Sequence, residues 1–336
     1  MPIEEGSTIS HLSAAMATTE DYTTQTTSSP LSEATFYIYC THLVIGVVGT
    51  VGNALTLYAL VASKQHKKHA MIVNQNAIDL FCSFFLIVTS VVRLSNVRLT
   101  GMPGYWLCIT ILSNILVAWG VYGSRINIAL IAIERYLKFV YPEWSKKVLR
   151  PWVIYSAMAF AWCVGVVILT PLVFKTTAVI DGECWAFRLY SSHDAKVAVR
   201  IFILSLFYVT ILVVLFFCYW RILVAVRRQA RVMAGHNAAG SSISSAQIVS
   251  INYVESNVIK TMVLVAAFYA LCNVPHGTLK IVQMSFPNLK IPYSFQPLTR
   301  ITPYLYIIMN PFIYAIKFDP VKQILRDMIP SCNRPV

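Results

Sequence analysis

The sequence predicts an all-α membrane protein built as a bundle of seven transmembrane helices. Three observations support this prediction. The 336-residue chain is 57% hydrophobic and only 12% charged, whereas soluble domains carry about 25% charged residues. Seven separate stretches are nearly free of charge, and the basic residues gather in alternate connecting loops.

Each of the seven stretches is long enough to cross a bilayer, which takes about 20 mostly apolar residues. Four contain no Asp, Glu, Lys or Arg, and the other three contain one each: Asp79, Arg125 and Arg300. Helices are expected because backbone groups must be satisfied within the membrane, and barrel strands would alternate in polarity. The stretches are 36–62, 71–92, 106–133, 152–174, 201–220, 261–279 and 291–316.

Residues 1–35 form a polar, acidic tail rich in Ser and Thr, whose composition predicts disorder. No cleavable signal peptide is visible, so the first span is expected to act as the targeting signal. Sixteen of the 27 Lys and Arg residues fall on the side of the C-terminus and nine on the other side. The positive-inside rule therefore predicts an extracellular N-terminus. The net charge of +13 reflects this bias, because no basic patch with interleaved aromatics suggests nucleic-acid binding.

A series of polar motifs occurs in order along the spans. The motifs are "GNAL" with Asn53, "NQNAIDL" with Asp79, "ERY" at 134–136, Trp162 with Pro171, "CNVP" at 272–275 and "NPFIY" at 310–314. Together they resemble the rhodopsin-like (class A) G protein-coupled receptor family over about 36–332. The resemblance implies a receptor domain at 36–316, and a short amphipathic eighth helix with a cytoplasmic tail at 317–336.

The resemblance implies a switch at the inner end of the third span. Arg135 would pair with its neighbour Glu134 or with Glu255, which lies 20 residues before Pro275, about 30 Å along a helix. Such a buried contact suits a two-state element that opens when a partner protein takes the arginine. The alternative is that Arg135 extends to lipid headgroups. The family pattern adds these residues to the switch: Tyr136, Tyr219, Asn310, Pro311 and Tyr314.

Asp79, Ser124 and Asn310 resemble part of the sodium pocket of the family, so an allosteric sodium ion is one expectation. The alternative is a structural network in which Asp79 contacts water or Arg125. No other cofactor is expected.

Cysteines near the two membrane faces give two further expectations. Cys108 and Cys184 would face the oxidising outer side, where a disulfide would tie the second outer loop to the third span. Cys332, near the inner face, is a palmitoylation candidate.

The chain departs from the family pattern at four places. Asn273 replaces the usual tryptophan of the sixth span, and Ile211 replaces the usual proline of the fifth. Arg125 occupies a normally apolar position. Cys108 lies 27 residues before Arg135, two more than usual.

The resemblance also limits the ligand. Val117 stands where amine receptors have an aspartate, and Tyr304 where opsins have a retinal-linked lysine, so a simple amine and a retinal Schiff base are disfavoured. Arg93 and Arg300 would receive a carboxylate or an acidic peptide, or would act as interfacial anchors. A neuropeptide is the preferred ligand, with a small acidic metabolite or lipid as the alternative. The candidate cavity residues are Arg93, Asn114, Val117, Trp119, Tyr122, Asn273, His276, Arg300 and Tyr304.

The predicted function is therefore signalling at the plasma membrane. The expected partners are a heterotrimeric G protein, arrestin, receptor kinases and membrane lipid. A transporter is the alternative class, but no inverted repeat is evident. An enzyme is not expected, because no H-E-x-x-H or G-x-S-x-G motif occurs.

Overall fold

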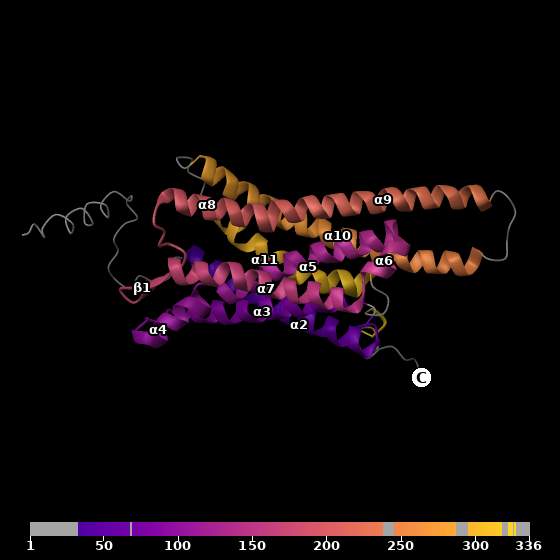
Figure 1. Cartoon of the computed structure of the whole chain (residues 1–336). Coiled ribbons are helices and arrows are strands. Elements are labelled where there is room, and N and C mark those ends of the chain that lie inside the picture. Colours follow the sequence, from indigo (N-terminus) through magenta and orange to yellow (C-terminus); the bar gives the residue numbers. More distant parts are fainter. Residues whose placement is uncertain are drawn as a thin grey trace, which may run out of the picture.

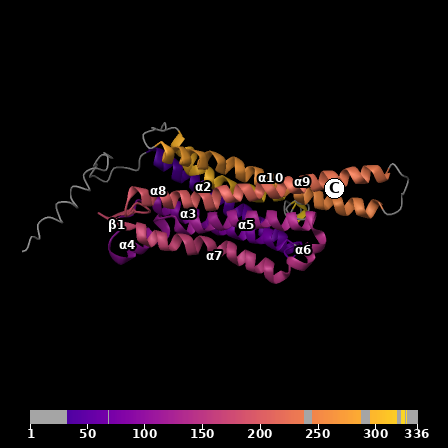
Figure 2. The ribbon, with the colours of Figure 1, turned by 45° about the horizontal axis from the view of Figure 1, so that its top comes forward.

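The computed structural model describes residues 33–67, 69–237, 245–286, 295–317, 322–324 and 326. These residues form long helices that run side by side, with one small β-hairpin at one end of the bundle (Figure 1). At the opposite end α9 (Thr210–Asn237) and α10 (Ser245–Ser285) extend beyond the other helices, and the view in Figure 2 shows the same arrangement. The predicted helical bundle is confirmed.

The helices follow the predicted spans, but the fifth continues 17 residues beyond its predicted end, the sixth begins 16 residues before its predicted start, and the seventh begins at Gln296, five residues later than predicted. The elements are α2 (Glu33–Ala62), α3 (Ala70–Leu94), α4 (Gly101–Leu107), η1 (Cys108–Leu112), α5 (Ile115–Val140), α6 (Pro142–Val148), α7 (Pro151–Thr176), β1 (Ala178–Ile180), β2 (Glu183–Trp185), α8 (His193–Leu204), η2 (Ser205–Val209), α9 (Thr210–Asn237), α10 (Ser245–Ser285) and α11 (Gln296–Lys317). The first helix therefore starts three residues inside the predicted tail. Residues 1–32, Cys332 and most of the predicted eighth helix lie outside the described residues.

Five helical segments within the described residues are long and apolar enough to cross a membrane. They are Glu33–Ala62, Ala70–Leu94, Gly101–Val140, Pro151–Thr176 and His193–Arg228. The helices α10 and α11 pack against each other, and against α5 and α2 respectively, so they complete a bundle of seven.

The third span is interrupted near its outer end. A π-helical turn, η1, is followed by Asn114 in the left-handed conformation, with φ 60° and ψ 22°. A π turn takes more residues than an α turn, and asparagine tolerates the left-handed region. Arg93 donates a hydrogen bond to the carbonyl of Leu112, which lies in this irregular segment. The interruption accommodates the two extra residues between Cys108 and Arg135.

The fifth span also contains a π-helical turn, η2, between α8 and α9. The hydroxyl of Thr210 donates to the carbonyl of Ser205 at 2.9 Å, which satisfies one of the backbone groups of this turn. The helix therefore departs from regular α geometry next to Ile211, although the usual proline is absent.

The β-hairpin fixes the second outer loop over the bundle. Its strands are antiparallel, and the turn between them uses Asp181 and Gly182, both with positive φ. Cys184 in β2 forms the expected disulfide with Cys108, with a Cα–Cα distance of 5.3 Å. The amide of Leu99 also donates to the carbonyl of Gly182 at 3.1 Å. The loop is thereby held against the outer end of the third span.

The third span lies at the centre of the bundle, and its glycines permit close packing. A Cβ atom at Gly120 would lie 2.6 Å from the Cβ atom of Cys82 in α3. At Gly123 it would lie 2.7 Å from the carbonyl oxygen of Ala161 in α7. Side chains on α5 are thus brought within reach of both neighbouring helices.

Candidate functional site

A cavity of about 300 Å³ opens in the outer half of the bundle. Its walls come from α5, α7, the segment after β2, α8, η2 and α10. The lining residues are Ala118, Tyr122, Arg125, Leu169, Leu172, Phe187, Tyr190, Val199, Arg200, Ile203, Leu204, Tyr208, Asn273, His276 and Lys280. This arrangement can enclose a small molecule or the end of a larger one.

Two departures from the family pattern meet at the inner end of this cavity. A terminal nitrogen of Arg125, Nη2, donates a hydrogen bond of 2.8 Å to Oδ1 of Asn273. The contact joins α5 to α10 at a point ten residues, or about 15 Å, above Arg135. Asn273 is itself held by a bond of 2.9 Å from its Nδ2 to the carbonyl of Tyr269.

The environment of Arg125 is aromatic rather than acidic. Its side chain is 7% exposed, and its guanidinium carbon lies 5.2 Å from the centre of the Tyr122 ring. Tyr269 and Tyr306 lie close enough to interact with it electrostatically. No described residue accepts a hydrogen bond from its Nε. A charge at mid-membrane costs about 2.5–3.5 kcal/mol even on translocon-insertion scales, so such residues are normally paired.

The structure brings Asp79, Ser124 and Asn310 together in the core. Ser124 Oγ donates to Asp79 Oδ1 at 2.6 Å, and Asn310 Nδ2 donates to Oδ2 at 2.6 Å. Gln75 Nε2 donates to the same Oδ2 at 3.0 Å. Asp79 thus accepts hydrogen bonds from three helices. The alternative in which Arg125 pairs with Asp79 does not hold in this arrangement, because the guanidinium donates to Asn273 instead. Sodium binding stays a prediction.

This core network extends beyond the residues singled out from the sequence. Gln75 also contacts Ser124 Oγ at 2.5 Å and accepts a bond of 2.9 Å from Asn127 Nδ2. Asn127 in turn accepts from Asn74 at 2.8 Å, and Asn74 accepts from the indole of Trp162 at 2.9 Å. The chain of bonds links α7, α3, α5 and α11. The motif "NQNAIDL" contains Asn74 and Gln75 of this network. Its three consecutive amide side chains in an apolar stretch are the sequence feature that could have predicted the network.

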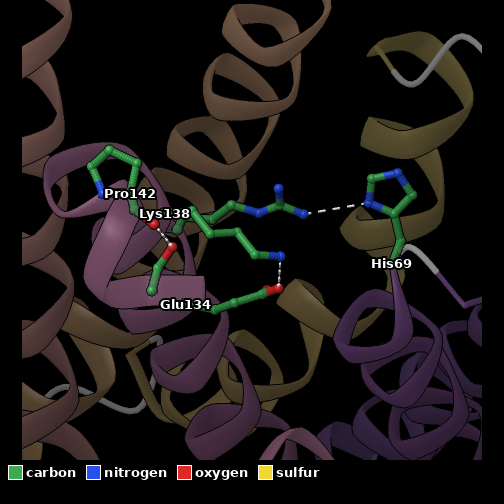
Figure 3. A network of polar contacts seen from close by, with 6 residues as sticks. His69, Glu134, Lys138 and Pro142 are labelled. Atoms are coloured by element: carbon green, nitrogen blue, oxygen red, sulfur yellow. Dashed lines mark hydrogen bonds and ion pairs between the residues drawn. The ribbon is translucent and has the colours of Figure 1, made fainter. Parts of the chain in front are cut away.

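At the inner end of α5 the side chains of Glu134 and Arg135 have other partners than expected (Figure 3). Glu134 forms an ion pair of 2.5 Å with Lys138, one turn further along the helix, rather than with Arg135. Adjacent residues on a helix point in different directions, whereas residues four apart are neighbours. The Nη2 of Arg135 lies 3.4 Å from Nδ1 of His69, at the start of α3. His69 was not identified from the sequence, since it belongs to no motif.

Other residues of the predicted switch lie on the inner halves of their helices. The Tyr136 ring packs edge to face on Tyr141 and Phe217, with centroid distances of 5.8 and 5.6 Å. Tyr219 is buried on α9, and Pro311 lies inside α11. Glu255 and Tyr314 belong to α10 and α11, but their side chains lie outside the described residues. Their predicted roles stay predictions.

Among the candidate ligand residues, Asn273 and His276 line the cavity, as does Tyr122. The others have different surroundings. Val117 is buried, and its carbonyl accepts from Cys82 Sγ at 3.5 Å. Asn114 forms the break in the third span. These two residues do not line this cavity.

The two outer arginines also lie away from the cavity lining. Arg93 lies 5.8 Å from the centre of the Tyr39 ring and donates to the backbone of the third span. The carbonyl of Arg300 lies 3.0 Å from His42 Nε2, and the same imidazole packs 4.9 Å from the Tyr304 ring. In their place the cavity contains Arg200 and Lys280, which sequence reasoning missed because neither belongs to a family motif.

Comparisons with known proteins agree with this arrangement. Residues 52–314 match the family described as "7 transmembrane receptor (rhodopsin family)". Galanin receptor type 2 of Homo sapiens is 25% identical over 278 residues, which cover 81% of this chain and 67% of that receptor. Somatostatin receptor type 5 of Rattus norvegicus is 24% identical over 347 residues, and the match covers 98% of this chain and 87% of that receptor. Melanopsin-A of Gadus morhua is 24% identical over 310 residues. This match covers 85% of this chain but only 51% of the length of that melanopsin. The crystal structure of squid rhodopsin superimposes with a TM-score of 0.69 at 18% identity, covering 89% of this chain and 87% of the rhodopsin.

Proposed function

Because the chain belongs to the rhodopsin family of seven-transmembrane receptors, we propose that it is a plasma-membrane receptor that activates heterotrimeric G proteins when an extracellular ligand binds. The distribution of basic residues supports an extracellular N-terminus. The observation that carries this proposal is the family match over residues 52–314, which includes the third-span motif at Arg135 and the whole seventh-span motif at 310–314.

The proposed mechanism is a shift between two arrangements of the bundle. An extracellular ligand favours the arrangement in which the inner end of α10 moves outward and Arg135 becomes available to the G protein. Arg135 is half-buried, and its Nη2 lies 3.4 Å from Nδ1 of His69, a ring nitrogen that accepts a hydrogen bond only when it carries no proton. A contact of this kind is weaker than a carboxylate pair, so a partner protein can displace it. By linkage, G protein binding raises ligand affinity by the same factor.

The proposed ligand is a neuropeptide or another molecule that presents an acidic group. Among the similar proteins are receptors named for galanin and for somatostatin. Light sensing is not proposed on the basis of the melanopsin relative, because Tyr304 stands where opsins carry the retinal-linked lysine. Arrestin and receptor kinases are proposed to act on the segment between α9 and α10, which contains several serines.

Nucleotide exchange on G proteins tests the proposal. Membranes that express the chain are screened with neuropeptide and metabolite libraries. Arg135→Leu is expected to abolish exchange, whereas Arg98→Leu makes the same chemical change on the exposed outer loop and is expected to have no effect. Solute flux without exchange would identify a transporter instead.

A further inference from the structure

The cavity in the outer half of the bundle is strongly cationic. Arg125 lies at its inner end, while Arg200 and Lys280 belong to the lining and are exposed to solvent. The half-buried imidazole of His276 lies between these levels on α10. None of the described residues that line the cavity is Asp or Glu. The cavity therefore favours anions over cations.

Arg125 has no counter-ion among the described residues. Both ion pairs found there, Lys138–Glu134 and Lys146–Glu143, lie on the inner side of the bundle. The carboxylate of Asp79 accepts its hydrogen bonds from Ser124, Gln75 and Asn310. A guanidinium offers five N–H donors and stays charged, so Asn273 and the hydroxyl of Tyr306 satisfy it only in part. The Nε–H group of Arg125 is one of the donors left over, since it makes no hydrogen bond to any described residue.

We propose that the cavity binds its ligand through a carboxylate, which becomes the counter-ion of Arg125. This inference rests on the proposed receptor function and names the chemical class of the ligand. The two oxygens of a carboxylate match the fork formed by Nε and a terminal nitrogen of arginine. Arg200 and Lys280 then attract the anion to the mouth of the cavity.

The remainder of the ligand is apolar. Leu169 and Leu172 of α7 and Ile203 of α8 line the same space, together with Phe187 from the segment after β2. A volume of about 300 Å³ holds a medium-sized acid or the last residues of a peptide. Two sources share this chemistry: a free carboxylic acid, and the C-terminal carboxylate of a peptide.

The geometry also links binding to the movement of α10. A carboxylate that takes hydrogen bonds from Arg125 competes with Oδ1 of Asn273 for the same guanidinium. Release of Asn273 removes the described side-chain bond between α5 and α10 at this level. Ligand binding and the helix contact thus draw on the same guanidinium, and a carboxylate on Nε and a terminal nitrogen weakens the bond to Asn273.

A thermal-shift assay on the purified full-length protein tests the proposal without a G protein. The probes are straight-chain carboxylates from acetate to decanoate, each compared with its uncharged amide. N-acetyl-Leu-Phe with a free or an amidated C-terminus forms a second arm. The variants are Arg125→Gln and Lys280→Gln, with Arg188→Gln as the control, because Arg188 packs on Trp185 and does not line the cavity.

We expect carboxylates to raise the unfolding midpoint more than their amides. The difference should disappear in Arg125→Gln, shrink in Lys280→Gln and persist in Arg188→Gln. Stabilisation by the alkyl acids identifies a free acid as the source, and stabilisation by the peptide acid alone identifies a peptide terminus. Equal effects of acid and amide, no effect of any acid, or an effect that chloride reproduces would overturn the proposal. Carboxylate binding without nucleotide exchange would instead refute the receptor function and leave the binding site intact.

Discussion

The bond between Arg125 and Asn273 gives a quantitative prediction about ligand-free signalling. Asn273→Leu keeps the size of the side chain but removes the acceptor, which lies 2.8 Å from Nη2 of the guanidinium. Hydrogen bonds to charged groups contribute about 1.5–3 kcal/mol in proteins, while polar contacts between membrane helices average about 0.6 kcal/mol. If the bond holds α10 against α5, its loss should shift the equilibrium toward the open arrangement by about 3-fold to 150-fold.

The assay is basal nucleotide exchange, normalised to the amount of receptor at the cell surface. Thr278→Val is the matched control, because the Thr278 hydroxyl donates only to the carbonyl of Val274 in its own helix, at 2.7 Å. A double-mutant cycle with Arg125→Leu separates the pair from its parts. Once Asn273 has been replaced, removal of the guanidinium should produce little further increase in exchange.

Two results would refute this reasoning. Basal exchange that stays at the wild-type level in a well-expressed Asn273→Leu receptor would show that the bond does not restrain α10. Additive effects of the two substitutions would show that Arg125 and Asn273 act through separate contacts.

Three further predictions concern the rest of the bundle. Glu255→Ala should raise ligand-free exchange if this residue pairs with Arg135, and unchanged exchange at equal expression would argue against the lock. Asp79→Asn replaces one carboxylate oxygen by a donor that faces other donors, so it should cost about 1–3 kcal/mol and lower the thermal unfolding midpoint; agonist affinity that is insensitive to sodium in the wild type would favour a purely structural role. Joint replacement of Cys108 and Cys184 by Ala should cost about 2–5 kcal/mol and reduce surface expression, whereas replacement of the exposed Cys163 should not.

The bundle itself could be predicted from the sequence because hydrocarbon imposes simple requirements. Uncharged stretches of sufficient length are expected to be helical, and the basic loops predict their orientation. The helix ends could not be predicted in the same way, because polar residues such as Glu33 continue a helix beyond its apolar stretch. Local irregularities were not predictable either. The break at Asn114 follows from one left-handed residue and a π turn, which no apolar pattern reveals.

The partners of buried polar groups were harder to predict than the groups themselves. Asp79 and Arg125 were evident as ions in apolar spans, and either a mutual pair or separate partners fitted the spacing. Their actual partners depend on helix rotation and on side-chain direction, which sequence separation does not specify. The same limit explains why the sequence left Glu134 open as a partner of Arg135, although Lys138 lies on the correct face of the helix to pair with Glu134.

The unusual residues at positions 125 and 273 are best understood as one change rather than two. Tryptophan at 273 would offer an indole N–H donor and no acceptor, so Arg125 would lose its hydrogen bond to α10. An apolar residue at 125 would leave the buried carbonyl of Asn273 without its partner from α5, at a cost of about 1–3 kcal/mol. Each departure therefore requires the other. A charged hydrogen bond between Arg125 and Asn273 therefore occupies the position at which the family pattern has an aromatic residue, and the proposed anionic ligand would compete for that bond.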